Sequence, residues 1–143
     1  MSFDALDISA SALNAQRTKM DTIASNIANI NTTRGPDGTK DVYRRKDAVF
    51  ASVYNESLSS EKGSGPIVSS GVKILEIAED TQTPLKKVYN PAHPDANEDG
   101  YVDLPNVNIV NEMVDMITAS RAYEANVTAI NATKSMVSSA MKI

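Results

Sequence analysis

The sequence predicts a mainly α-helical protein with a small β-rich insert, in which two long terminal helices pair as a coiled coil around central strands and loops. The first observation is the position of the helix-breaking residues, because all six Gly and all six Pro lie between Gly35 and Pro105. The second is charge. Residues 1–34 and 106–143 each carry three basic and three acidic side chains, so the net charge of −4 belongs to the centre. The 143 residues therefore divide into an N-terminal helical segment, 1–34, a central β and loop segment, 35–105, and a C-terminal helical segment, 106–143.

The third observation is the apolar spacing of the N-terminal segment, which repeats every seven residues and favours a helix with one apolar seam. This seam consists of Leu6, Leu13, Met20, Ile23, Ile27 and Ile30. Ser2 is a plausible N-cap, and the helix is expected to run from about Phe3 to Ile30. It should end at Asn31-Thr32-Thr33, before Gly35 and Pro36.

The C-terminal segment has the more regular seam, with alternating steps of four and three residues that are interrupted only by the polar Ser120 and Lys134. Its apolar members are Ile109, Met113, Met116, Tyr123, Val127, Ile130, Val137 and Met141. Pro105 prevents an earlier start, and Asn106 or Asn108 can cap the first turn. A helix from about Val107 to Met141 follows.

A long helix with one apolar stripe must bury that stripe. The simplest partner for each terminal helix is the other one, and an ordinary small bundle is the alternative. The remaining faces are rich in small and amide residues, such as Ala122, Ala125, Asn126 and Ala129, instead of Lys and Glu. Because small side chains let helices approach closely, these faces indicate burial by further subunits.

Three central runs have the composition of β-strands: residues 42–54, Gly71–Glu79 and Leu85–Tyr89. A small antiparallel sheet is expected. Between the first two runs, the Ser- and Gly-rich stretch Ser57–Gly65 reads as a mobile loop.

Several classes of function are excluded or lack support. Without Cys and with a single His, the chain has no disulfide framework, thiolate zinc site or cysteine nucleophile. No phosphate loop or catalytic carboxylate pair stands out, so we expect no catalytic residue, no cofactor and no small-molecule substrate. A net charge of −4 without a basic stripe makes a nucleic-acid partner improbable. No apolar run approaches the ~18 residues of a membrane span, and residues 1–7 lack the basic start of a secretory signal peptide.

One stretch resembles a metal site. Asp95-Ala96-Asn97-Glu98-Asp99-Gly100 matches the first six positions of an EF-hand calcium loop. Position twelve requires a bidentate acid, and here it is Asn106. Pro94 and Pro105 also oppose the flanking helices of an EF-hand. We therefore favour an Asx-rich turn that leads into the last helix, and expect no metal.

Two other polar features are ambiguous. His93 stands alone in a turn-like stretch and is expected to be a hydrogen-bonding or exposed residue. The basic cluster Arg44-Arg45-Lys46 can hold an anion, but Asp41 and Asp47 flank it. We expect it to form a solvated strand face or an ion-pairing patch between subunits.

Two motifs resemble the terminal signatures of the bacterial flagellar rod and hook family. The N-terminal motif is Ser25-Asn26-Ile27-Ala28-Asn29-Ile30-Asn31-Thr32, and the C-terminal motif spans residues 112–126, from Glu112-Met113-Val114 to Glu124-Ala125-Asn126. Many members follow the first motif with Gly and an aromatic residue, whereas here Arg34-Gly35-Pro36 intervenes, as in the branch of proximal rod subunits. The motif residues singled out by this resemblance are Asn26, Asn29, Asn31, Glu112, Arg121, Tyr123 and Asn126.

The resemblance implies a structural subunit of the flagellar basal body, not an enzyme. Members of the family assemble helically, with both terminal helices in the inner tube, and form the torque-transmitting rod and its export channel. The implied partners are further copies of the chain, other rod subunits and the flagellar type III export apparatus, and the implied location is the periplasmic rod, reached without a cleaved signal peptide. The alternative is a free-standing coiled-coil adaptor with a calcium-responsive Asp-rich loop at residues 95–103.

Overall fold

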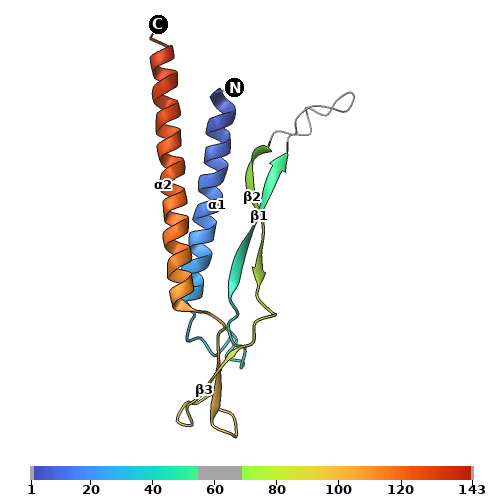
Figure 1. The fold of residues 1–143 in the computed structure, drawn as a ribbon. Coiled ribbons are helices and arrows are strands. Elements are labelled where there is room, and N and C mark those ends of the chain that lie inside the picture. Colours follow the sequence, from blue (N-terminus) through green and yellow to red (C-terminus); the bar gives the residue numbers. More distant parts are fainter. Residues whose placement is uncertain (1, 55–68, 143) are drawn as a thin grey trace. The chain divides into compact units, whose positions relative to one another are not determined.

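The computed structural model describes residues 2–54 and 69–142 (Figure 1). Two long helices flank four short strands, which confirms a mainly helical fold with a small β insert. In chain order, the elements are α1 (Ser2–Ala28), β1 (Lys46–Tyr54), β2 (Ser69–Glu79), β3 (Lys86–Tyr89), β4 (Tyr101–Leu104) and α2 (Ile109–Ala140). The expected mobile loop Ser57–Gly65 lies outside the described residues.

The strands form two separate antiparallel pairs, β1 with β2 and β3 with β4, where the sequence predicted a single small sheet. Strand β4 was not predicted, because residues 101–104 were assigned to the Asp-rich turn. In the structure that turn joins β3 to β4, with Tyr89 opposite Tyr101 and Val88 opposite Val102. Gly100 closes the turn at φ 77°, where an added Cβ would come within 3.0 Å of the Tyr89 ring.

The chain divides into two compact units, and each combines pieces that lie far apart in sequence. Unit 1 contains Met1–Lys19, Ala48–Glu76 and Thr118–Ile143, and unit 2 contains Met20–Asp47 and Ile77–Ile117. Each unit thus includes one part of α1 and one part of α2. The predicted division into residues 1–34, 35–105 and 106–143 remains a prediction about the assembled protein.

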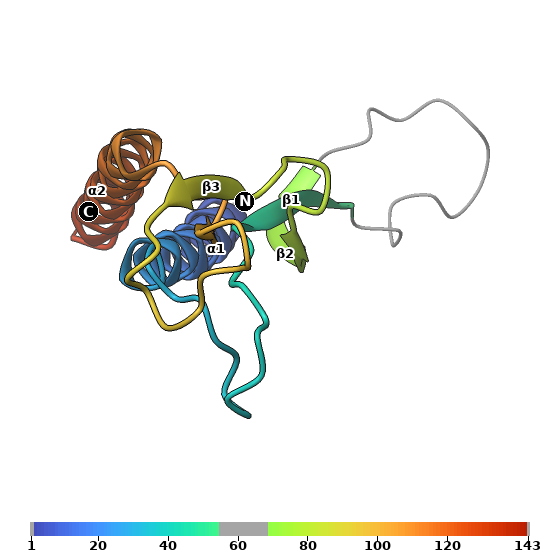
Figure 2. The same ribbon diagram turned by 90° about the horizontal axis from the view of Figure 1, so that it is seen from below.

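Unit 2 has a mixed core. Its buried apolar side chains are Ile23 from α1, Val102 from β4 and Val107 from the approach to α2, beside the fully buried Pro105. Between α1 and β1 the chain turns back on itself in a narrow loop (Figure 2), which is closed by hydrogen bonds such as Tyr43 N to Thr32 O at 3.4 Å. This loop brings residues 43–47 to the end of α1.

Unit 1 has a thinner core. Among the described residues of this unit, the buried apolar side chains are Ala15, Ala48 and Ala119. Strand β2 approaches α1 closely at Gly71, where the Val72 amide donates to Ser11 Oγ at 3.1 Å. A Cβ added at Gly71 would lie 2.5 Å from that same oxygen, so glycine is required for the contact.

Candidate functional site

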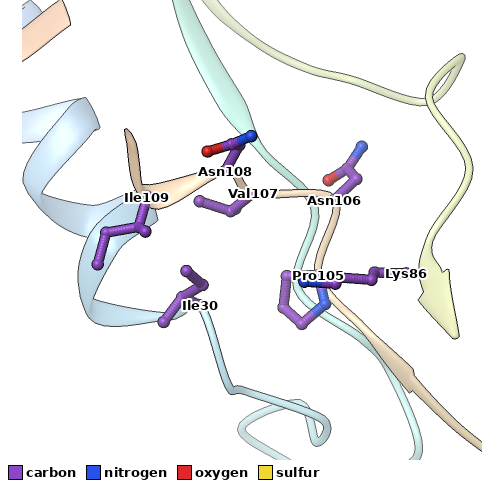
Figure 3. Close-up of a pocket in the computed structure, with 7 residues that line it drawn as sticks. All are labelled: Ile30, Lys86, Pro105, Asn106, Val107, Asn108 and Ile109. Atoms are coloured by element: carbon purple, nitrogen blue, oxygen red, sulfur yellow. The ribbon is translucent and has the colours of Figure 1, made fainter. Parts of the chain in front are cut away.

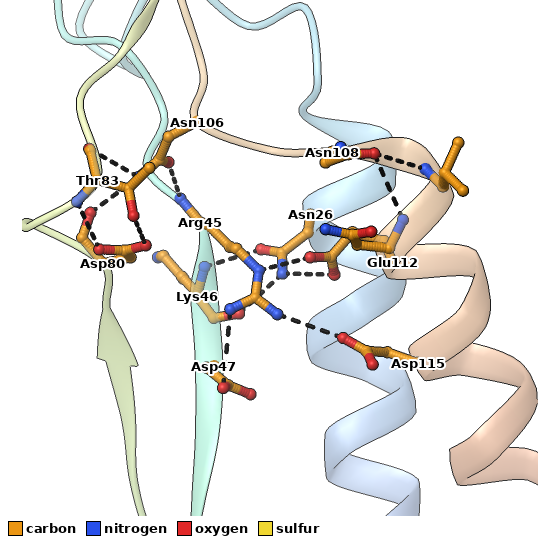
Figure 4. Close-up of polar contacts among 12 residues, drawn as sticks. Asn26, Arg45, Lys46, Asp47, Asp80, Thr83, Asn106, Asn108, Glu112 and Asp115 are labelled. Atoms are coloured by element: carbon orange, nitrogen blue, oxygen red, sulfur yellow. Dashed lines mark hydrogen bonds and ion pairs between the residues drawn. The ribbon is translucent and has the colours of Figure 1, made fainter.

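A buried polar cluster joins the end of α1 to the start of α2 within unit 2 (Figure 4). Asn26, which is 0% exposed, stands at its centre. Its amide nitrogen donates to Lys46 O at 2.8 Å and to Glu112 Oε2 at 3.0 Å. Its amide oxygen accepts from Lys46 N and from the Tyr43 hydroxyl, both at 2.9 Å. All four hydrogen-bonding positions of the side chain are therefore occupied.

Glu112 in the first turn of α2 is also 0% exposed. One carboxylate oxygen accepts from Asn26, and the other accepts from Arg45 Nε at 2.6 Å. The Arg45 guanidinium also lies 3.4 Å from Asp115 and 3.7 Å from Asp47. Partial burial acts to lower the pKa of Arg45, but the hydrogen bond to Glu112 and the nearby negative charges together raise it above the ordinary value. The site presents two donors, Asn26 Nδ2 and Arg45 Nε, to the two oxygens of Glu112. A glutamine at this position would offer only one acceptor oxygen, so a carboxylate is needed to satisfy both donors.

Local capping brings these two residues together. Asn29 Nδ2 donates at 2.8 Å to Ser25 O, a carbonyl in the last turn of α1 that also accepts from Asn29 N at 3.1 Å. Asn108 Oδ1 accepts from Val110 N at 3.0 Å and from Asn111 N at 3.4 Å, which caps the first turn of α2. Of the two predicted capping residues, Asn108 is therefore the one in use.

Asn106 connects three other segments of unit 2. Its side-chain oxygen accepts from Arg45 N at 2.7 Å, and its amide donates to Asp80 O at 3.0 Å and Thr83 O at 3.2 Å. The Asp80 carboxylate is itself held by the Thr83 hydroxyl at 2.6 Å, which lowers its pKa. Asn106, which is not the acidic residue that position twelve of a calcium loop requires, therefore has a structural role in holding these three segments together.

The Asp-rich turn is held by contacts within the chain. Asp95 accepts from Thr33 Oγ1 at 2.7 Å and from Arg34 Nε at 2.8 Å. The Arg34 hydrogen bond, with that of Thr33, lowers the pKa of Asp95 from 3.8 to about 2. His93 Nδ1 accepts from the Asp95 amide at 3.1 Å, so this histidine hydrogen-bonds within the turn. Within residues 2–54 and 69–142, no three His, Cys, Asp or Glu side chains converge to hold a metal ion.

The basic cluster Arg44–Lys46 has partners in its own chain, which corrects the expectation of a solvated face or an ion-pairing patch between subunits. Arg45 pairs with Glu112, and Lys46 Nζ lies 3.4 Å from Glu79. Arg44 Nη1 donates to Asp80 O at 3.5 Å. The sequence could not reveal this, because the partners are 33 to 67 residues away.

The predicted seam residues differ in burial. In α1 and just after it, Ile23 is buried, and Leu6, Leu13, Met20, Ile27 and Ile30 are partly exposed. In α2, the partly exposed members are Met116, Tyr123, Val127, Ile130 and Val137. Ile109, Met113 and Met141 are exposed, at 45%, 54% and 82%. At the start of α2, the buried side chain is Glu112, whereas Met113 is exposed. The pairing of the two seams along their length remains a prediction.

An apolar face is exposed at the start of α2 in unit 2. Its members, called here the α2 apolar face, are Ile109, Val110, Met113, Val114 and Ile117, each at least 45% exposed. Ile109 also lines an open pocket of about 340 Å³ together with Ile30, Val107 and Lys86 (Figure 3). From the sequence alone, Val110 and Ile117 only widen the apolar stripe of this helix and do not indicate a separate exposed face.

The family-motif residues fall into different environments. Asn26, Asn29 and Glu112 belong to the polar cluster and its helix ends. Asn31 and Arg121 are exposed, and Tyr123 and Asn126 are partly exposed. Asn126 donates to Ala122 O at 2.8 Å within α2. The sequence analysis did not place Tyr43, Arg45 or Asn106 in this network, although it noted Arg45 in the basic cluster and Asn106 as a candidate cap.

The polar cluster is suited to holding elements together and not to reacting with a substrate. Asn26 and Glu112 are inaccessible to solvent and their polar atoms are occupied. In the part of the chain that the structure describes, neither helix has the apolar length needed to cross a membrane. The α2 apolar face, in contrast, is accessible for binding.

Comparison with known proteins gives matches at both ends of the chain. Residues 6–36 match the family model described as flagella basal body rod protein, and residues 98–143 match the flagellar basal body rod FlgEFG protein C-terminal model. The flagellar basal-body rod protein FlgC of Borreliella burgdorferi is 45% identical, over 99% of this chain and 96% of its own length. The FlgC proteins of Bacillus subtilis and Escherichia coli O6:H1 are 45% and 42% identical, over 99% and 92% of this chain and 97% and 89% of their own lengths.

Two helical ends joined by a buried Asn–Glu–Arg cluster, with rod-protein matches at both termini, define a flagellar basal-body rod protein. This class consists of structural proteins and is not an enzyme family. Within it, the near full-length identity is decisive: the chain belongs to the family of flagellar basal-body rod protein FlgC.

Proposed function

We propose that this protein is a structural subunit of the proximal rod, which assembles helically through its terminal helices into the torque-transmitting shaft and lines part of the export channel. Its partners are further copies of itself and other rod subunits. It reaches the periplasmic rod through the flagellar export apparatus. The FlgC names of its relatives support the rod assignment.

The observation that supports this proposal most directly is the exposed apolar surface at the start of α2. The α2 apolar face contains five large side chains within nine residues. Soluble monomers seldom expose so many large apolar side chains together unless the surface binds a partner. The alanine core of unit 1 supports the same conclusion, because three buried methyl groups contribute only a small hydrophobic stabilisation. Further subunits would supply the missing burial.

The polar cluster suits a subunit that transmits torque. A rotating shaft requires contacts that do not slide, and hydrogen bonds fix a helix in rotation and in register where apolar contacts alone permit slippage. Asn26 and Glu112 fix the end of α1 and the start of α2 in this way. Neither helix contains a Gly or Pro at which it could bend.

Incorporation of seam variants into the rod tests the proposal. Met116→Asp and Ile130→Asp place a charge on the partly buried stripe of α2, and we expect each variant to be absent from isolated basal bodies and to abolish swimming. Asn111→Asp, at an exposed position of the same helix, is the matched control and should support swimming. Normal motility with both seam variants would contradict the assembly role of the stripe.

A further inference from the structure

The side-chain oxygen of Gln16 is buried without a hydrogen bond. Gln16 lies on α1 in unit 1, and its side chain as a whole is partly exposed. Its Oε1 atom, however, is covered by the folded chain, and no donor within residues 2–54 and 69–142 reaches it. A buried acceptor of this kind loses the hydrogen bonds that water makes to it in the unfolded chain and gains none in return. Gln16 therefore opposes the folding of the region that covers it.

Two donors that lie near Gln16 on α1 are engaged elsewhere. The Ser11 hydroxyl donates to Ile8 O at 2.7 Å. Lys19 places its ammonium over the Phe50 ring, with Nζ 5.5 Å from the ring centroid. A change of rotamer in either neighbour would therefore break a contact that it already makes before it satisfied Gln16.

Gln16 is also an exception to the apolar pattern of its helix. It stands seven residues before Ile23 and fourteen before Ile30, at a position that the predicted seam fills with apolar residues. Ile23 is buried at the equivalent position in unit 2. A methionine at residue 16 would have nearly the length of glutamine but would carry no amide that needs a partner. The polar group at this position is therefore not required by the size of the side chain.

The other buried groups of unit 1 do little to offset this cost. Among its described residues, the buried apolar side chains are Ala15, Ala48 and Ala119, and each contributes a single methyl group. Unit 2, in contrast, buries larger apolar side chains and a polar cluster in which Asn26 has every hydrogen-bonding position occupied. The two units should therefore differ in stability, and the less stable one contains Gln16.

We propose that Gln16 is a built-in destabilising residue, which keeps unit 1 in equilibrium with an open form while unit 2 stays folded. This inference goes beyond the proposed rod function and does not depend on it. In the open form, the part of α1 up to Lys19 loses its cover, and its backbone amides exchange with solvent. Leu6 and Leu13, which the closed unit covers in part, then become accessible to a binding partner.

Hydrogen–deuterium exchange of the purified full-length chain tests this device, because it reports local opening amide by amide. In the unsubstituted protein, we expect the amides of residues 15–19 to exchange about tenfold faster than those of residues 23–28, although both segments belong to α1. Gln16→Met removes the unsatisfied amide. This variant should slow exchange in unit 1 about tenfold and leave exchange in unit 2 unchanged.

Two further variants control the test. Gln82→Met, at an exposed position of unit 2, should change exchange in neither unit, and Gln16→Leu keeps the test valid if methionine packs poorly at residue 16. Unchanged or faster exchange of unit 1 in both Gln16 variants would overturn the proposal, because the amide would then not destabilise the folded chain. Equal slowing in both units, or equal exchange of residues 15–19 and 23–28 in the unsubstituted protein, would also overturn it, because the two units would then open together.

Discussion

Removal of the Glu112 carboxylate should destabilise unit 2 more than any other single truncation in α2. In the folded protein this carboxylate accepts from Asn26 Nδ2 at 3.0 Å and from Arg45 Nε at 2.6 Å while fully buried. Glu112→Ala leaves the Asn26 amide with one N–H that water cannot reach. Arg45 keeps Asp115 and Asp47 as partners and can turn its partly exposed guanidinium toward solvent.

The expected cost follows from these two contacts. A hydrogen bond to a charged group contributes about 1.5–3 kcal/mol, and an unsatisfied buried donor costs about 1–3 kcal/mol. Together they predict a loss of about 2.5–6 kcal/mol, which brackets the roughly 3–5 kcal/mol measured when one partner of a buried ion pair is removed. Glu112→Gln keeps one acceptor but turns an amide NH₂ toward a donor, so we expect a smaller loss of about 1–3 kcal/mol.

Urea unfolding of the purified chain, followed by circular dichroism, measures these differences. Glu124→Ala, at an exposed acid of the same helix, is the matched control and should change the free energy of unfolding by less than about 0.5 kcal/mol. The reasoning is refuted if Glu112→Ala has no larger effect than this control. A double-mutant cycle of Arg45→Ala and Glu112→Ala then measures the coupling free energy between the two side chains.

Three further changes have defined outcomes. Asn26→Asp replaces a donor by a carboxylate facing Glu112 and Lys46 O, so we expect a loss of about 3 kcal/mol at pH 7 that diminishes as the pH falls and the new carboxyl is protonated. Because the pKa of Asp95 is lowered from 3.8 to about 2, its contribution to stability should be complete above pH 3.8 and disappear as the pH falls through about 2, a dependence absent in Asp95→Asn. Gly71→Ala should cost about 1–3 kcal/mol, because Gly71 has φ 136° and the new Cβ meets Ser11 Oγ at 2.5 Å, and Ser11→Ala should recover part of this loss.

Each of these has a clear contrary result in equilibrium unfolding measurements. A pH-independent defect in Asn26→Asp would mean that the new carboxylate does not face Glu112. If the free energy of unfolding falls equally with pH in the wild-type protein and in Asp95→Asn, Asp95 does not contribute to acid unfolding. Strictly additive effects of Gly71→Ala and Ser11→Ala would show that the two residues are not in contact.

Local patterns predicted the helices well and the polar contacts poorly. The absence of Gly and Pro before Gly35 and after Pro105 placed both helices to within two residues at each end. Strand β4 was missed because its four residues follow an Asp-rich turn and are too few to show alternation. Arg45 was assigned to solvent or to another subunit, since no sequence rule pairs it with an acid 67 residues away.

The sequence by itself therefore determined the elements whose causes are local: helix periodicity, a cap at Asn106 or Asn108, the Asx-rich turn before the last helix and the terminal motifs that indicate a rod protein. Only the tertiary structure decided which residues of those motifs are buried and why. Asn26 and Glu112 are far apart in the chain, and they become a matched pair only when folding removes both from water and leaves each as the other's partner. The same pairing orients the start of α2, and with it the apolar side chains that remain exposed there.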